Sequence, residues 1–295
     1  MKNTVFTGAG VAIVTPMHPD GSINYDRLGA LLDFQLAGGT DAIIICGTTG
    51  EASTLTDDEH IELIRYTVER INKLIPVVAG VGSNDTSYAL WLTKEAEEAG
   101  ADALLHVTPY YNKTSQAGLI RHFTAVADAT SLPVILYNVP ARTGMSVKPE
   151  TYLALSEHPN IVATKEAGGN ISEIAQTASL CGDSLDIYSG NDDQIVPILS
   201  LGGKGVISVA SNIIPREVHD LCRLYLEGRV RESAALQLAL LDLMNAMFID
   251  VNPIPVKAAM NLMGLDVGEC RMPLAPLAPG ALESLKAIME KHGLV

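Results

Sequence analysis

The sequence predicts an α/β fold, a closed (β/α)8 TIM barrel with a C-terminal helical extension. Three observations support this prediction. Short apolar runs alternate with runs of helical periodicity, and the alternation occurs eight times before residue 229. The apolar runs are continuous rather than interrupted by polar residues, which indicates parallel strands covered on both faces. Eight regular units with no second domain favour a closed barrel over an open doubly wound sheet.

Each of the eight units contributes one strand and one helix. We expect strands in the continuous apolar runs, at residues 8–16, 41–47, 76–82, 101–109, 133–140, 161–167, 186–190 and 205–212. Helical periodicity follows at residues 25–37, from 56, and at 86–99, 116–129, 149–157, 172–180, 194–201 and 215–227. Thr56 and Asn170 each precede a glutamate by three residues, a spacing typical of a helix start.

The last part of the chain differs from the rest. Residues 229–295 carry helical periodicity and no strand run, so we expect two or three helices there. Prolines near Asn252-Pro-Ile-Pro255 should interrupt one of them. The predicted organisation is therefore a catalytic barrel at 1–228 and a helical extension of the same chain at 229–295.

Composition excludes several classes of function. The 295 residues are 47% hydrophobic and 18% charged, which indicates a large core. A net charge of −14 without a basic patch argues against nucleic acid as a partner. No apolar run is long enough to cross a membrane and we identify no signal peptide, so a cytoplasmic location is expected. Metal-ligand spacings, a P-loop and a dinucleotide fingerprint are lacking, so we expect neither a metal nor a cofactor.

Polar groups follow several predicted strands, at the end where barrel active sites form. Lys165 ends the sixth strand, Tyr137 the fifth, and Thr48 and Thr49 follow the second. A lysine at the end of an apolar strand is costly unless it is used or paired. A desolvated amine can form a Schiff base with a carbonyl compound. The alternative, and the commoner situation for a single lysine, is an ion pair at the rim with Glu166.

The neighbouring side chains favour the catalytic interpretation. A phenol at Tyr137 would lie beside Lys165 and could transfer protons during imine formation. Arg142, in a Pro-x-Arg-Thr-Gly turn after the fifth strand, could clamp a carboxylate, although most arginines are ordinary surface charges. The threonine hydroxyls and backbone N–H groups of Gly47-Thr-Thr-Gly-Glu51 could hold a second carboxylate.

These motifs together resemble the 4-hydroxy-tetrahydrodipicolinate synthase (dihydrodipicolinate synthase) family of class I, pyruvate-dependent Schiff-base lyases and aldolases. The resemblance covers essentially the whole chain, and its motifs occur in order and at the family's spacing. It rests on Gly47-Thr-Thr-Gly-Glu51, Tyr110-Tyr-Asn112, Tyr137-Asn-Val-Pro-Ala-Arg-Thr-Gly144, Lys165-Glu-Ala167 and Asn252-Pro-Ile-Pro-Val-Lys257.

The resemblance implies condensation of pyruvate with L-aspartate 4-semialdehyde, the first committed step of diaminopimelate and lysine biosynthesis. Lys165 would form the imine with pyruvate, and Thr48, Tyr137 and Tyr111 would relay protons. Thr49 would hold the pyruvate carboxylate in a pocket lined by the Gly190 and Ile207 backbones, and Arg142 would bind the semialdehyde. Because the family reaches Tyr111 across an interface, a homo-oligomer of at least two chains is implied. We expect a tetramer of two dimers, which the residues themselves do not distinguish from a dimer.

Sister enzymes on the same barrel remain an alternative. N-acetylneuraminate lyases and 2-keto-3-deoxy sugar acid aldolases use the same lysine but usually carry small or apolar residues at the position of Arg142. A non-enzymatic, keto-acid-binding barrel is the second alternative, and the intact set of catalytic residues argues against it.

The resemblance also implies an effector site for lysine, which this sequence keeps only in part. Its residues would be Ala52, Ser53, Asp57, His60, Asn84, Tyr88 and Tyr110. Lysine-sensitive members typically carry histidine at the position of Asp57 and glutamate at the position of Tyr88. We therefore expect weak or absent inhibition by lysine.

Overall fold

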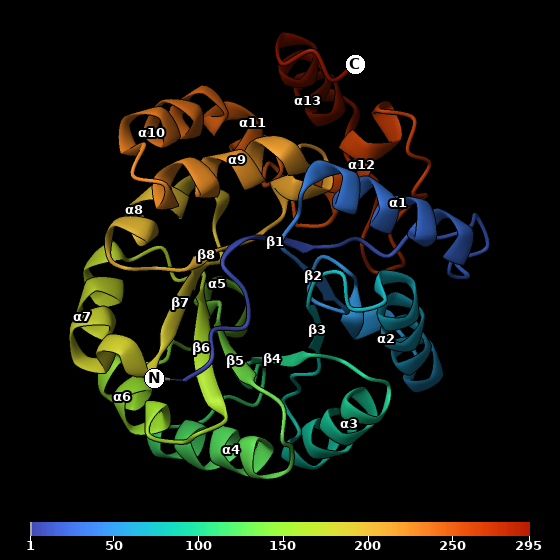
Figure 1. Ribbon diagram of the computed structural model, residues 1–295. Helices are drawn as coiled ribbons and strands as arrows, with labels where there is room; N and C mark the ends of the chain where they lie inside the picture. The colour runs from blue at the N-terminus through green and yellow to red at the C-terminus, as the bar shows by residue number, and fades with distance from the viewer. Residues whose placement is uncertain (1) are drawn as a thin grey trace.

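The computed structural model describes residues 2–295 and confirms the predicted barrel. Eight parallel strands pair in chain order, and β8 closes the barrel by pairing with β1. Figure 1 shows the strands in the centre with the helices of the repeating units around them. The strands are β1 Gly8–Ala12, β2 Ala42–Ile45, β3 Val77–Gly80, β4 Ala103–Val107, β5 Val134–Asn138, β6 Ile161–Glu166, β7 Asp186–Ser189 and β8 Gly205–Ser208.

Most of the helices cover the outside of this barrel (Figure 1). Those of the barrel region are α1 Tyr25–Gly38, α2 Asp57–Ile71, α3 Thr86–Glu98, α4 Gln116–Asp128, α5 Pro140–Thr143, α6 Pro149–Ser156, α7 Ile171–Cys181, α8 Ile195–Ser200 and α9 Pro215–Leu226. Short 3₁₀ turns are η1 Ala52–Thr54, η2 Gly182–Ser184, η3 Asp192–Gln194 and η4 Ala210–Asn212. Both capping predictions are confirmed, since Thr56 and Glu59 form a capping box and the Asn170 side chain caps α7. Within residues 2–295 no helix has the length and apolar character needed to span a membrane.

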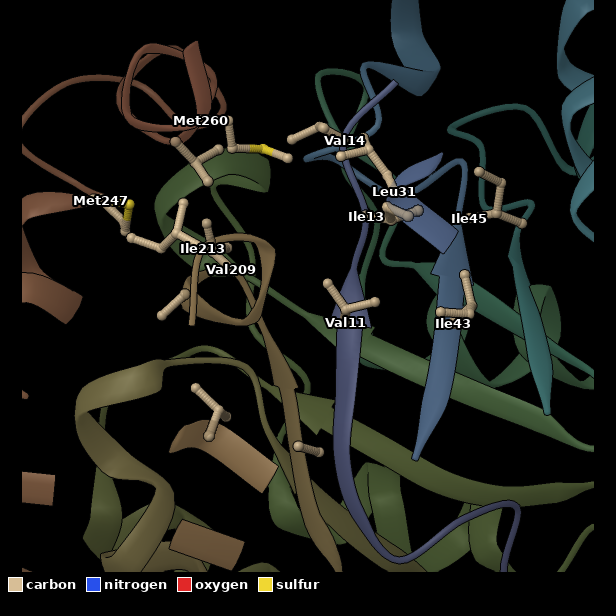
Figure 2. Packing of buried hydrophobic residues seen from close by; sticks show 14 of the residues in the cluster. Val11, Ile13, Val14, Leu31, Ile43, Ile45, Val209, Ile213, Met247 and Met260 are labelled. Carbon is tan, nitrogen blue, oxygen red and sulfur yellow. The ribbon is translucent and has the colours of Figure 1, made fainter. Parts of the chain in front are cut away.

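The C-terminal extension packs against the side of the barrel where β8 meets β1. Its helices are α10 Val230–Ala239, α11 Leu241–Ala246, α12 Ile254–Leu262 and α13 Pro279–Lys291. Figure 2 shows Met247 and Met260 from this extension directed toward Ile213 and Val14 of the barrel region. All four side chains belong to one buried cluster, so the extension shares the largest core of the protein.

Several local predictions differ from the structure, and strand one, predicted to end at residue 16, ends at Ala12. The extension has four helices rather than two or three, because the break at Leu240 between α10 and α11 involves neither proline nor glycine. Strand eight ends at Ser208 instead of residue 212. The backbone turns into η4 there because the Asp192 carboxylate accepts hydrogen bonds from the N–H groups of Val209 and Ala210. The short helix α5, which begins with Pro140, was not expected.

Candidate active site

Lys165 and Tyr137 lie side by side inside the barrel at the carboxyl ends of β6 and β5. The register of the two strands places them opposite each other. Both side chains are buried, with 5% and 7% of their surface exposed. The Lys165 Nζ atom lies 4.3 Å from the centroid of the Tyr137 ring, which is the geometry of a cation–π contact. The amine therefore lies against the face of a phenol ring, the two kinds of group that imine chemistry uses.

The alternative ion pair between Lys165 and Glu166 is not present. Successive side chains of a strand point to opposite faces, so the two residues diverge. The Glu166 carboxylate is bonded to Asn138 and Tyr152 instead. The lysines that do form ion pairs in residues 2–295 are Lys73, Lys204, Lys257, Lys286 and Lys291. The Lys165 amine is therefore buried without a carboxylate partner.

The loop after β2 presents the two threonines. Backbone hydrogen bonds from Gly50 to Gly47 and from Glu51 to Thr48 fold it into a tight turn. Thr48 is half-buried and Thr49 is fully buried. The Thr49 hydroxyl accepts a hydrogen bond of 2.9 Å from the Asn252 side chain. The hydroxyl that the resemblance assigns to a carboxylate thus has its orientation set by the C-terminal extension.

Arg142 lies in α5, directly after β5, and is exposed. Its guanidinium donates a hydrogen bond of 2.9 Å to the backbone carbonyl of Asn252. Asn252 therefore contacts both residues that are proposed to bind substrate carboxylates. Its side chain bonds to Thr49, and its backbone carbonyl bonds to Arg142. The Asn252 Oδ1 atom is buried and has no hydrogen-bond partner within the described chain.

Gly190 directly follows β7, and Ile207 is the next-to-last residue of β8. A Cβ atom on Gly190 would lie 2.7 Å from the Ala167 side chain and 3.0 Å from the Glu166 carbonyl, so only glycine fits there. Ile207 is fully buried in the barrel interior, in the same cluster as Tyr137. The buried Asp192 follows Gly190 closely. Burial raises the pKa of its carboxyl, while hydrogen bonds, first of all from Ser208, and to a smaller extent the Lys165 charge oppose this effect.

Tyr111 is separated from the buried residues of the site. It is 91% exposed and has a positive φ of 67°, an uncommon backbone conformation for a non-glycine residue. Tyr110 beside it is 36% exposed. Within a single chain Tyr111 therefore has a surface position, unlike Tyr137.

Two residues of the expected effector site are hydrogen-bonded to each other. The Tyr88 hydroxyl donates to the Asp57 carboxylate at 2.7 Å. Burial and this carboxylate raise the pKa of Tyr88 to about 12. His60 is 5% exposed, and its Nε2 atom is bonded to the Gly80 carbonyl at 2.7 Å. The carboxylate at Asp57 and the imidazole at His60 are thus already occupied by protein partners. Ala52 and Ser53 belong to η1, and the Asn84 carbonyl accepts from the Asn112 side chain.

A buried ion pair at the base of the threonine loop was not predicted from the sequence. The Lys257 amine lies 2.9 Å from the Glu51 carboxylate, and both side chains are nearly inaccessible. The motif that begins at Asn252 is visible in the sequence. However, nothing local indicates that its lysine crosses to a glutamate 206 positions away. In residues 2–295 no cluster of histidine, cysteine, aspartate or glutamate could hold a metal ion.

A closed (β/α)8 barrel with a buried, unpaired lysine amine at the end of β6 has the architecture of a Schiff-base enzyme. The chain belongs to the dihydrodipicolinate synthetase family, whose model it matches over residues 5–292.

Relatives and solved structures agree with this assignment. The chain is 55% identical over 295 residues to the 4-hydroxy-tetrahydrodipicolinate synthase of Acetivibrio thermocellus, covering 100% of both. It superposes with a TM-score of 0.97 at 41% identity on the chloride-inhibited dihydrodipicolinate synthase of Acinetobacter baumannii, crystallised with pyruvate. It also superposes with a TM-score of 0.96 at 40% identity on the lysine-bound enzyme of Cyanidioschyzon merolae. Each structural match covers 99% of this chain and 100% of the other.

Proposed function

We propose that this protein condenses pyruvate with L-aspartate 4-semialdehyde to give 4-hydroxy-tetrahydrodipicolinate, as a lyase of diaminopimelate and lysine biosynthesis. The observation that carries the proposal is the buried Lys165 amine, which rests against the Tyr137 ring without a carboxylate partner. Membership of the family and the names of the relatives support the same reaction.

The first half of the reaction takes place on pyruvate. The unprotonated Lys165 amine attacks the keto carbon to give a carbinolamine, and loss of water leaves a protonated imine. Tyr137 moves the protons that the addition and the dehydration require, with Thr48 completing the relay. Thr49 and the backbone at Gly190 and Ile207 hold the pyruvate carboxylate. The positive imine then acidifies the methyl group, and loss of a proton gives the enamine.

The second half forms the new carbon–carbon bond. The enamine carbon attacks the aldehyde carbon of the semialdehyde, whose oxygen takes a proton and becomes the 4-hydroxyl group. Arg142 binds the carboxylate of this second substrate through a bidentate contact. The amino group of the semialdehyde then attacks the imine carbon and closes the ring. This transfer of the imine releases the Lys165 amine for the next cycle.

Arg142 also distinguishes this reaction from that of the sister aldolases. A guanidinium at the barrel mouth suits a small substrate with a carboxylate close to its aldehyde, whereas the sugar-acid aldolases usually have a small or apolar residue there. A barrel that binds keto acids without turnover has no need for the combination of Lys165, Tyr137 and Arg142.

The proposal includes assembly and location. Tyr111 would act in the relay of a neighbouring copy, for which its 91% exposure and fixed, unusual backbone conformation are suitable. The active unit is then at least a homodimer, and two dimers form the expected tetramer. The 1–228 barrel and the 229–295 extension work as one unit because Asn252 orients Thr49. We place the enzyme in the cytoplasm with its substrates.

The same proposal covers regulation. Tyr88 supplies no carboxylate for the amino groups of lysine, and it engages Asp57 itself. We therefore propose that lysine inhibits this enzyme weakly or not at all, and a submillimolar inhibition constant would contradict this.

Borohydride trapping with pyruvate tests the central claim. Reduction of an imine gives a stable secondary amine, which peptide mass spectrometry can locate on one lysine. We expect the adduct on Lys165, its loss in Lys165→Ala, and its retention in the matched variant Lys204→Ala, since Lys204 pairs with Asp186 at the other end of the barrel. An unlabelled Lys165 would refute the proposal. Turnover with the semialdehyde but not with sugar aldehydes would then separate a synthase from an aldolase.

A further inference from the structure

Glu166 is a buried carboxylate next to the catalytic lysine that the reaction itself does not use. It is the last residue of β6 and points to the outer face of the barrel, where 4% of its surface is exposed. Its carboxylate accepts a hydrogen bond of 2.5 Å from the Tyr152 hydroxyl, which in turn accepts from Thr164 at 3.0 Å. It also accepts from the Asn138 amide at 3.1 and 3.3 Å. Tyr152 and Asn138 both donate to the carboxylate, and neither carries a positive charge.

The contact with Asn138 joins two strands at the level of the site. Asn138 is the register partner of Glu166 on the outer face, directly beyond the inner pair of Tyr137 and Lys165. The amide of Asn138 has a fixed orientation, because its oxygen accepts from the Val147 backbone N–H at 3.2 Å. Its nitrogen must therefore face Glu166, and this contact requires an acceptor at position 166.

The surroundings of Glu166 make its charge sensitive to pH. Burial raises its pKa to about 7, while the hydrogen bonds from Tyr152 and Asn138 act in the opposite direction. Glu173 on α7 lines the same small cavity and raises this pKa further. Of the charged and titratable groups around it, α6 contributes Tyr152 and α7 contributes Glu173, whereas Lys165 faces the opposite side of the strand. A proton on Glu166 would turn one of its two acceptor oxygens into a donor and so weaken the contact with Asn138 or with Tyr152.

We propose that Glu166 is a positioning residue for the reaction at Lys165. Its ionised carboxylate clamps Asn138 of β5 to β6 and thereby holds the Tyr137 phenol and the Lys165 amine at their working separation. The residue acts through the strands and does not touch substrate. The inference rests on the proposed role of Lys165. A purely structural carboxylate would affect stability but leave the rate of imine formation and its pH dependence unchanged.

The test measures the rate at which pyruvate and borohydride label Lys165 in the intact enzyme, from pH 6 to 8.5. Glu166→Gln turns an NH2 group toward the Asn138 NH2 group or loses the Tyr152 contact. Since small misplacements of reacting groups cost up to about 100-fold, we expect labelling at pH 7.5 to slow by roughly 10-fold or more. In the wild type we expect the labelling rate to fall as the pH drops below about 7, which is the acid limb of the pH profile. This fall should be lost in Glu166→Gln. The double variant Asn138→Asp with Glu166→Gln restores a donor facing an acceptor, and it should recover most of the rate.

Glu173→Gln is the matched control. It removes a negative charge from the same cavity without contacting Asn138, so the rate at pH 7.5 should not fall and can rise only slightly. The midpoint of the acid limb should move to lower pH, because the neighbouring charge that raises the pKa of Glu166 is gone.

The outcomes separate the two proposals. A wild-type protein that is not labelled at Lys165 refutes the proposed function. Normal labelling of the wild type, with an unchanged rate and profile in Glu166→Gln, refutes the role of Glu166. If Glu166→Gln fails to fold, Tyr152→Phe provides the test. Loss of the Tyr152 donor should raise the pKa of Glu166 and move the acid limb to higher pH. An unmoved acid limb overturns the proposal.

Discussion

Replacing Lys257 by methionine should weaken the fold and the substrate site together. The Lys257 amine is 2.9 Å from the Glu51 carboxylate and donates to the carbonyls of Thr15 and Glu269 at 3.1 and 2.7 Å. Methionine keeps the length of the stem but supplies no donor. The Glu51 carboxylate, 3% exposed, would retain only the bond from the Arg271 backbone N–H at 2.8 Å.

Removing one partner of a buried ion pair costs about 3–5 kcal/mol, because the remaining charge is left uncompensated. Unfolding entropy of about 2.1 cal/mol/K per residue gives roughly 0.6 kcal/mol/K for a chain of 295 residues. The melting temperature should therefore fall by about 5–8 °C, measured by circular dichroism. The Michaelis constant for pyruvate should also rise, since Asn252 lies two residues before the start of α12, which carries Lys257, and orients the Thr49 hydroxyl.

Two control variants test this reasoning. Lys291→Met removes an ion pair with Asp242 in which the lysine is 66% exposed. An exposed pair contributes at most about 1 kcal/mol, so this change should lower the melting temperature by less than about 2 °C. Adding Glu51→Gln to Lys257→Met removes the buried charge and should restore part of the loss. Equal shifts for Lys257→Met and Lys291→Met would refute the argument.

Three further predictions concern substrate, pH and effector. Arg142→Ala should leave trapping of pyruvate on Lys165 nearly intact but reduce kcat/KM for the semialdehyde, and equal damage to both would contradict its assigned role. Burial lowers the pKa of His106 to about 3 from its ordinary 6.5. The unfolded chain then binds a proton between these values that the folded chain does not, so stability should fall as pH decreases, by about 2 kcal/mol from pH 7 to pH 5. Urea unfolding at both pH values measures this loss, which His106→Gln should remove. Asp57→His combined with Tyr88→Glu should create inhibition by lysine, and an unresponsive double variant would show that other residues determine sensitivity.

The repeating units could be predicted from the sequence because their signals are local. A continuous apolar run identifies a buried parallel strand, and a threonine three residues before a glutamate identifies a helix start such as that of α2. The predicted end of a strand was wrong where a group distant in sequence determines the backbone conformation. The apolar residues after Ser208 extend the run of β8, but the Asp192 carboxylate binds the N–H groups of Val209 and Ala210 and ends the strand.

The candidate site shows the same division. Strand order alone indicates that Thr48, Tyr137 and Lys165 share the barrel mouth, since each follows or ends a strand. The contribution of the extension could not be predicted in this way. Asn252 reaches Thr49 across 203 positions of sequence, and no periodicity relates the two. Such contacts depend on how the extension packs on the barrel, which Met247 and Met260 help to fix through the shared core (Figure 2).

Lys165 and Glu166 illustrate why neighbouring charges in a sequence need a structural context. In a helix, opposite charges interact when they are three or four residues apart. In a strand, adjacent residues face opposite sides of the sheet, so an i, i+1 pair cannot form an ion pair across it. The amine is consequently free for substrate on the inner face, while the carboxylate finds Tyr152 and Asn138 on the outer face. The alternation that rules out their ion pair also places a nucleophile and its proposed clamp on adjacent residues of one strand.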